Sequence, residues 1–86
     1  MPSIRVVSAK PLPDACLLIT FNNGITKTYD TKNLFKEYQD FEVLKNPDIF
    51  NLVQVEPGGY GIYWSPELDC SEGELWENST PYPNPV

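Results

Sequence analysis

The fold is decided by residues 16–30, which read CLLITFNNGITKTYD. Two runs rich in β-branched, aliphatic and aromatic residues flank Asn23 and Gly24, and this pattern predicts a β-hairpin. Asparagine and glycine adopt the left-handed backbone of a tight turn at little cost. Antiparallel β-sheet is therefore the expected framework of the fold.

The register of this hairpin follows from where its apolar side chains would lie. A two-residue turn at Asn23 and Gly24 would scatter them over both faces, whereas a three-residue loop over 22–24 gathers them on one face. Because a slip by one residue moves every side chain to the other face, we expect the three-residue loop, with Gly24 in the left-handed region. This register pairs Phe21 with Ile25. The apolar face then carries Leu17, Ile19, Phe21, Ile25 and Tyr29.

Further strands are expected on both sides of the hairpin. Residues 4–9 are largely β-branched and predict a first strand that ends where prolines, beginning with Pro11, interrupt it. Residues 52–56 and 62–64 predict a second hairpin across the glycine-rich residues 57–61, which we interpret as a turn and not as a phosphate-binding loop. The expected fold class is α+β, with a small antiparallel β-sheet built from the first strand, the hairpin and the second hairpin, and two or three short helices.

Residues that cap helix N-termini predict where these helices begin. Asp30 or Thr31 can cap the first helix. Asn46, followed by a proline, is a stronger start for the second, because proline suits the first helical turn. Ser71 and Glu74 have the spacing of a capping box for the third. The apolar residues expected on these helices, and on an irregular bridge between the first two, are Leu34, Phe35, Tyr38, Phe41, Leu44, Ile49, Phe50, Leu75 and Trp76.

A chain of 86 residues has room for one domain with a modest core. We expect a single α+β domain over residues 1–79. Residues 80–86 are rich in proline, cannot form a helix or a central strand, and are expected to be an extended or disordered tail.

The composition excludes most enzyme classes. The chain has no His, which excludes Ser-His and Cys-His catalysis and every His-containing zinc site. Glu67, Asp69 and Glu72 match no calcium-binding loop, and nothing in the sequence would give one of them the role of acid and another that of base. We therefore expect no catalytic residues, no cofactor and no metal site.

The expected location is the cytoplasm. The N-terminal residues lack the long apolar stretch of a signal peptide, and the longest apolar run, residues 16–19, is far too short to span a membrane. In the cytoplasm Cys16 and Cys70 are expected to be free thiols, with Cys16 a small hydrophobic side chain of the core.

Charge is divided unevenly along the chain. Residues 1–45 hold all six basic residues and five acidic ones, a net charge of +1, whereas residues 46–86 hold seven acidic residues and no basic one, a net charge of −7. Surfaces that bind nucleic acids directly are usually basic, so direct nucleic-acid binding is not expected. A charged partner of the second half should instead be a small basic protein. The alternative is that the excess acid only keeps the protein in solution.

Large aromatic side chains are concentrated between residues 60 and 76. They either build the core or anchor a partner, and Tyr60 is the best candidate for an exposed anchor because it lies in the glycine-rich turn. The candidate partner-binding residues are Tyr60, Tyr63, Trp64, Glu67 and Asp69.

The order of motifs along residues 4–78 resembles a known family. The motifs are Lys10-Pro11-Leu12-Pro13-Asp14, Leu17 to Phe21 with Asn23-Gly24, Asp30, Phe41, Leu44-Lys45-Asn46-Pro47, Phe50, Val55-Glu56-Pro57-Gly58-Gly59-Tyr60, Gly61-Ile62-Tyr63-Trp64, Glu67 and Leu68-Asp69. Their arrangement is similar to the small bacterial domain-of-unknown-function 2442 family. The pair Leu75-Trp76 stands where this family commonly has Leu-Tyr.

The resemblance implies a compact bacterial α+β domain with no assigned enzymatic activity and no established catalytic residues. Relatives are often encoded beside another small protein, in an arrangement that looks like a toxin–antitoxin pair, and some are fused to a helix-turn-helix DNA-binding domain.

Three functions stay open at this level. The leading hypothesis is a non-enzymatic protein-interaction module, the antitoxin-like member of a two-gene unit. The second is a transcription-linked accessory domain that contacts DNA indirectly or as a dimer, and the third is a carboxylate-based enzyme. Sheet edges that pair between copies are also compatible with a homodimer.

Overall fold

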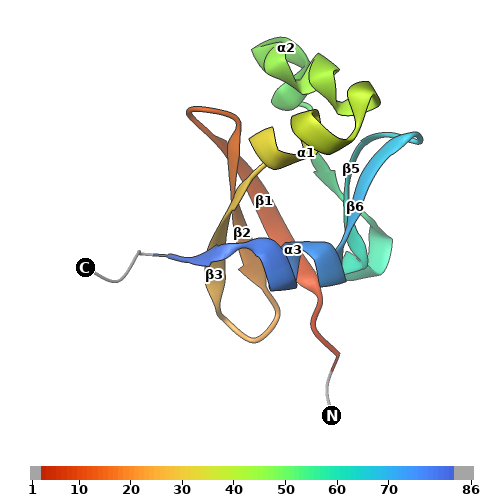
Figure 1. Ribbon diagram of the computed structural model, residues 1–86. Helices are drawn as coiled ribbons and strands as arrows, with labels where there is room; N and C mark the ends of the chain where they lie inside the picture. Colours follow the sequence, from red (N-terminus) through yellow and green to blue (C-terminus); the bar gives the residue numbers. More distant parts are fainter. Residues whose placement is uncertain (1–2, 83–86) are drawn as a thin grey trace.

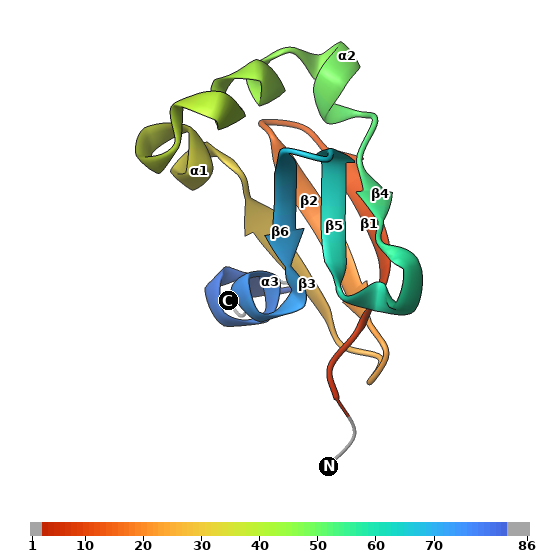
Figure 2. The ribbon, with the colours of Figure 1, turned by 90° about the vertical axis from the view of Figure 1, so that its right-hand side faces the viewer.

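The computed structural model describes residues 3–82 and contains two antiparallel sheets that pack face to face (Figures 1 and 2). The larger sheet has the strand order β1 (Val6–Leu12), β2 (Cys16–Phe21), β3 (Thr26–Asp30) and β7 (Thr80–Pro81). The smaller sheet has the order β4 (Gln54–Val55), β5 (Gly61–Ser65) and β6 (Leu68–Ser71). The predicted α+β class is confirmed, with the strands divided between two sheets.

The register of the first hairpin is confirmed. Leu17 lies opposite Tyr29, and the backbone N–H of Phe21 donates to the carbonyl of Ile25 at 2.9 Å. Gly24 has a φ of +84°, in the left-handed region. Leu17, Ile19, Phe21 and Tyr29 of the predicted apolar face are buried, whereas Ile25, which lies opposite Phe21 as predicted, is not. Ile25 follows the turn at the open end of the hairpin and is 43% exposed.

Strand β1 continues through the proline that was expected to end it. Pro11 lies opposite Leu17 within the ladder. Because β1 is at the end of the strand order, one side of its backbone needs no partner strand, and a missing N–H on that side costs no ladder hydrogen bond. A bulge between Val6 and Ser8 shifts the register and leaves Val7 60% exposed.

The smaller sheet contains the predicted second hairpin and one strand that the sequence did not predict. Val55 lies opposite Ile62, as expected for the hairpin across residues 57–61. The additional strand is β6, in which Leu68 and Cys70 are buried and the residues between and after them are exposed. A strand of four residues gives too short an alternation of apolar and polar residues to be recognised within an acidic segment.

All three predicted helix starts are confirmed. Thr31 precedes the first helix, and the neighbouring Asp30 accepts a hydrogen bond from the N–H of Lys32 at 2.9 Å. Asn46 accepts from the second residue of its helix at 3.0 Å, and Ser71 accepts from the third residue of its helix at 3.2 Å. The helices are α1 (Lys32–Glu37), η1 (Gln39–Lys45), α2 (Pro47–Phe50), η2 (Pro57–Gly59) and α3 (Glu72–Asn78), of which η1 and η2 are 3₁₀ helices.

The helices close the two ends of the space between the sheets. Helices α1, η1 and α2 lie together over one end, and α3 crosses the other end between β6 and β3 (Figures 1 and 2). The bridge that was expected to be irregular is the 3₁₀ helix η1. The core that these elements enclose consists of Val6, Leu17, Ile19, Phe21, Tyr29, Leu34, Leu44, Phe50, Val53, Ile62, Trp64, Leu68, Cys70 and Leu75.

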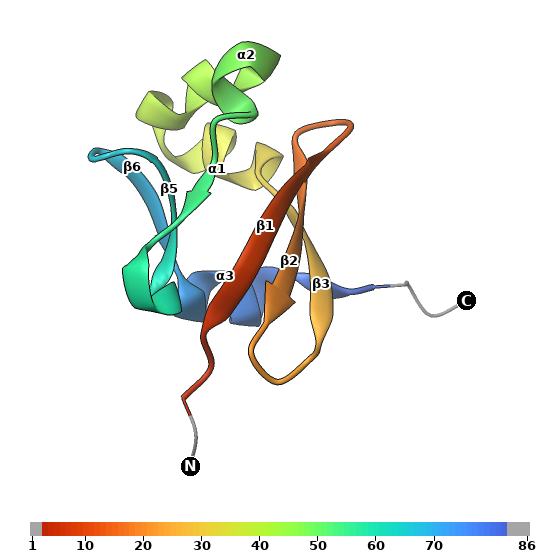
Figure 3. The same ribbon diagram turned by 180° about the vertical axis from the view of Figure 1, so that it is seen from behind.

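The two sheets meet where the glycine-rich turn lies against β1 (Figure 3). A Cβ on Gly59 would lie 2.5 Å from the backbone oxygen of Val6, and Gly59 also has a φ of +77°. A Cβ on Gly61 would lie 2.2 Å from the backbone oxygen of Cys70. Both positions therefore require glycine, because a Cβ at either one would overlap the neighbouring backbone oxygen and push the two segments apart.

The last described residues extend the larger sheet. Thr80 lies opposite Thr28, and the N–H of Tyr82 donates to the carbonyl of Thr26 at 3.0 Å. Residues 83–86 of the expected tail lie outside the described residues. Within residues 3–82, no helix is long and apolar enough to cross a membrane.

Alanine at either of the two contact glycines should lower the free energy of unfolding by about 3 kcal/mol, because it adds steric overlap with a backbone oxygen. Gly73→Ala is the matched control. Its Cβ would meet only the Ser71 hydroxyl at 3.8 Å, so it should raise stability by about 0.5 kcal/mol. Urea unfolding of Gly59→Ala, Gly61→Ala and Gly73→Ala measures the difference, and equal stability of the three variants would contradict the close approach.

Candidate functional site

A groove between α1 and α3 brings together acidic side chains from three elements. Its inner part is a hollow of about 230 Å³ beside β6, and it continues into a hollow of about 550 Å³ that shares Glu37 and Glu74 with it. We call the two together the acidic groove. Its lining residues are Tyr29, Asn33, Leu34, Lys36, Glu37, Tyr38, Phe41, Asp69, Cys70, Ser71, Glu74 and Asn78.

Each acidic residue of the groove is placed by a different element. Glu37 is the exposed last residue of α1, and Asp69 is exposed on β6. Glu74 lies in the first turn of α3 and accepts a hydrogen bond from the hydroxyl of Tyr29 at 2.9 Å. Because Tyr29 is buried in the larger sheet, this bond fixes the Glu74 carboxylate at the floor of the groove.

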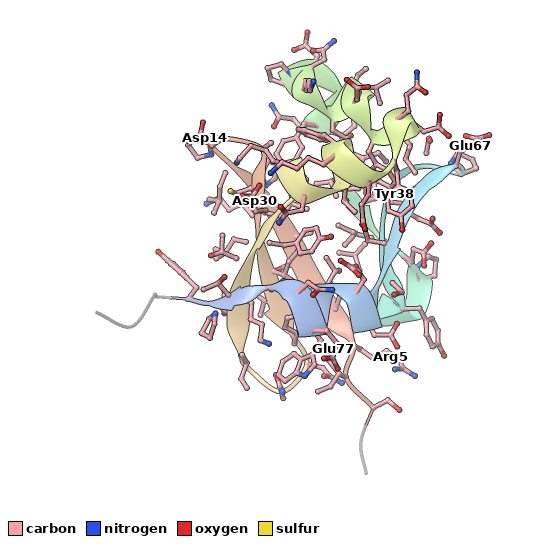
Figure 4. The ribbon with its side chains drawn as sticks, in the orientation of Figure 1. Arg5, Asp14, Asp30, Tyr38, Glu67 and Glu77 are labelled. Atoms are coloured by element: carbon pink, nitrogen blue, oxygen red, sulfur yellow. The ribbon has the colours of Figure 1, made fainter. Side chains whose placement is uncertain are left out.

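Aromatic side chains form the wall of the groove beneath the helical end. Tyr38 follows α1 and is 54% exposed, and its ring centroid lies 6.0 Å from that of Phe41. Figure 4 shows Tyr38 on the side of α1 that faces β6. An exposed aromatic face beside carboxylates suits a cationic side chain, which can contact both.

The negative charge of the groove is largely uncompensated. Among residues 3–82, Glu37, Asp69 and Glu74 have no Lys or Arg nitrogen within 4.0 Å. Among the basic residues that the structure describes, only Lys36 lines the groove. The ion pairs elsewhere in the described structure join Arg5 to Glu72, Lys32 to Asp30 and Lys45 to Glu42.

The two buried side chains beneath the groove, Cys70 and Tyr29, keep their protons near neutral pH. Burial, together with the nearby Glu74 carboxylate, raises the pKa of the Cys70 thiol from 9.0 to about 12. Burial likewise raises the pKa of Tyr29, with added contributions from Cys70 and Glu74. The groove thus combines these two neutral side chains with the carboxyl groups of Glu37, Asp69 and Glu74.

The residues expected to bind a partner do not form one site. Tyr63 and Asp69 lie opposite each other on β5 and β6 and line a hollow of about 310 Å³ on the outer side of the smaller sheet. Asp69 therefore borders both this hollow and the acidic groove. Glu67 is exposed at the tip of the β5–β6 hairpin, away from α1 and α3 (Figure 4).

Tyr60 and Trp64 lie apart from these residues. Tyr60 is 55% exposed, and the guanidinium of Arg5 lies 4.3 Å from its ring centroid. Trp64 is a core residue and not an exposed anchor, because it is only 9% exposed. Its Nε1 donates to the carbonyl of Phe50 at 3.0 Å, and its ring stacks on that of Phe50. The hydrogen bond satisfies the indole in the core, so Trp64 is not available to a partner.

The sequence did not predict that Glu37 of α1 and Glu74 of α3 belong to the site. Glu37 and Glu74 are 37 positions apart in the chain, and no motif spacing connects them. The only available signal was an acidic residue in the last turn of one predicted helix and another in the first turn of a second. Their common groove depends on how the sheets pack, which the local pattern does not encode.

The expected place of Cys16 in the core is wrong. Cys16 is only partly buried, and its Sγ donates to the carbonyl of Asp14 at 3.6 Å and lies 3.9 Å from Nζ of Lys32. It belongs to the outer face of the larger sheet, because the alternation that buries Leu17 points Cys16 outward. The buried thiol is that of Cys70, and both cysteines are free.

One further hollow, of about 610 Å³, lies between the β1–β2 turn and the helical end and is largely apolar. Its wall is made mainly of Pro11, Leu12, Pro13, Phe35, Leu44, Pro47 and Phe50. Within the described part of the chain, no group of three or more metal-ligating side chains forms a candidate metal site.

Comparison with known proteins places the chain in a family. The family model described as protein of unknown function (DUF2442) matches residues 6–81. The chain is a DUF2442 protein. The match covers both sheets and every helix of this DUF2442 fold. Curated proteins and solved structures gave no match.

Because the Cys70 thiol is buried beneath the groove, the stability of this DUF2442 protein should depend on pH. Between pH about 9 and about 12 the unfolded chain loses the Cys70 proton while the folded protein keeps it, so stability falls as pH rises, by up to about 1.4 kcal/mol per pH unit from this group. Urea unfolding across this range should show a shallower fall in Cys70→Val than in Cys16→Ser. Identical pH profiles for the two variants would contradict the assignment.

Proposed function

We propose that this protein is a non-enzymatic interaction module that binds a small basic protein through the acidic groove. The observation that carries the proposal is that Glu37, Asp69 and Glu74 line one groove. Among the described residues, no Lys or Arg nitrogen lies within 4.0 Å of their carboxylate oxygens. Carboxylates held in this way attract a cationic partner and repel an anionic one.

The site fits a protein better than a nucleic acid. Phosphate groups that approached the groove would meet carboxylates, and the net charge of −6 opposes binding to a polyanion. Tyr38 and Phe41 add an apolar contact of the kind that anchors protein partners.

In the cell, this role corresponds to the antitoxin-like member of a cytoplasmic two-gene unit. The resemblance to relatives encoded beside a second small protein supports this context, and the acidic groove supports a basic product of the neighbouring gene. A small basic reading frame beside the gene would identify the partner to test.

Co-purification from the native host tests the proposal. The tagged full-length chain should retain a basic protein at low salt and release it at high salt, because the attraction between the charges is screened. The variant Glu37→Gln/Asp69→Asn/Glu74→Gln should weaken the complex at least about tenfold. Glutamine at position 74 can still accept the hydrogen bond from Tyr29, so the fold is preserved.

A matched control removes the same number of charges elsewhere. The variant Asp14→Asn/Glu42→Gln/Asp48→Asn changes three exposed carboxylates that do not line the groove. It should bind the partner within about threefold of the unmodified protein. Equal weakening in both triple variants, or recovery of an acidic partner, would refute the groove as the binding site.

A further inference from the structure

We propose that the basic partner binds by adding an extended strand to the free edge of β6, inside the acidic groove. This inference rests on the proposed function for the charge of the partner, and it goes beyond that function in assigning the binding mode. Strand addition uses backbone hydrogen bonds for affinity and alternate side chains for specificity.

The free edge follows from the order of the smaller sheet. Strand β6 is the last in the order β4-β5-β6, so within residues 3–82 its backbone pairs with a strand on one side only. The N–H of Glu72 donates to the carbonyl of Tyr60 at 2.9 Å, and hydrogen-bonded pairs alternate in an antiparallel ladder. Ile62 and Cys70 are therefore the next hydrogen-bonded pair.

This alternation points the backbone groups of Asp69 and Ser71 away from β5. The carbonyl of Ser71 accepts the first backbone hydrogen bond within α3, because Ser71 is the N-cap of that helix. The N–H and carbonyl of Asp69 and the N–H of Ser71 remain for another strand. No backbone hydrogen bond from the rest of the described chain reaches these three groups.

The groove leaves room along this edge. Three consecutive residues, Asp69, Cys70 and Ser71, line the same hollow of about 230 Å³. Successive side chains of a strand point to opposite faces, so one hollow that touches all three must lie against the strand edge. Tyr38 and Phe41 form the opposite wall of this hollow.

The charges select the incoming strand. A second copy of this chain that paired through the same edge would bring Asp69 against Asp69, and like charges at a strand edge disfavour such pairing. A strand with Lys or Arg at alternate positions would instead direct its cations toward Glu37 and Glu74. The occupant is therefore a basic extended segment of a different protein.

Two synthetic peptides of equal charge and length separate this binding mode from charge attraction alone. One alternates lysine with valine, and the other alternates lysine with proline, which cannot donate the backbone hydrogen bonds of a strand. The full-length protein should bind the lysine–valine peptide at least about tenfold more tightly. Hydrogen exchange by NMR should show slower exchange at the amides of Asp69 and Ser71 when this peptide is bound.

A pair of protein variants provides a second measurement. Asp69→Asn and Asp69→Pro remove the same charge, but only the proline removes the outward N–H, at an edge position where proline is tolerated. The lysine–valine peptide should bind Asp69→Pro several-fold more weakly than Asp69→Asn, and a circular dichroism spectrum shows whether both variants are folded. If Asp69→Pro does not fold, the comparison of the two peptides decides alone.

The outcomes distinguish this inference from the proposed function. Equal binding of the two peptides, abolished by the groove triple variant, would overturn strand addition and leave the acidic groove as a binding site for basic chains. Slowed exchange at β1 or β7 in place of β6 would also overturn it. Failure of both peptides to bind would overturn strand addition, while co-purification with the native partner would decide the proposed function separately.

Discussion

The contact of the glycine-rich turn with β1 determines how the two sheets are arranged. At Gly59 and Gly61 the chain approaches the backbone oxygens of Val6 and Cys70 more closely than any side chain would permit. The Gly59–Val6 contact joins the two sheets along one side, and the Gly61–Cys70 contact brings β5 close to β6 within the smaller sheet. Since β6 pairs with β5, they also determine where the free edge of β6 lies.

The acidic groove lies on the opposite side from this junction. There β3 leads through Thr31 into α1, and β6 leads through Ser71 into α3, so the two helices flank the gap between the sheet edges. The hydrogen bond from Tyr29 to Glu74 spans this gap from one sheet to the helix that follows the other. The groove is thus a product of the whole fold and not of any single motif.

Local physics accounts for the part of this structure that the sequence predicted. The hairpin register followed from gathering apolar residues such as Phe21 on one face, and the helix starts followed from side chains such as Ser71 that satisfy free N–H groups. The continuation of β1 through Pro11 depended on its place at a sheet edge, which local pattern does not reveal. The same holds for the site, because Glu37 and Glu74 meet only after both sheets have packed.

Zero-length carbodiimide coupling of the purified complex tests the central claim most directly, because it joins a carboxylate to a lysine only where the two are in contact. Applied to the protein with its co-purified basic partner, it should join partner lysines to Glu37, Asp69 and Glu74. Coupling confined to carboxylates outside the groove, such as Asp14, Glu42 and Asp48, would contradict the account.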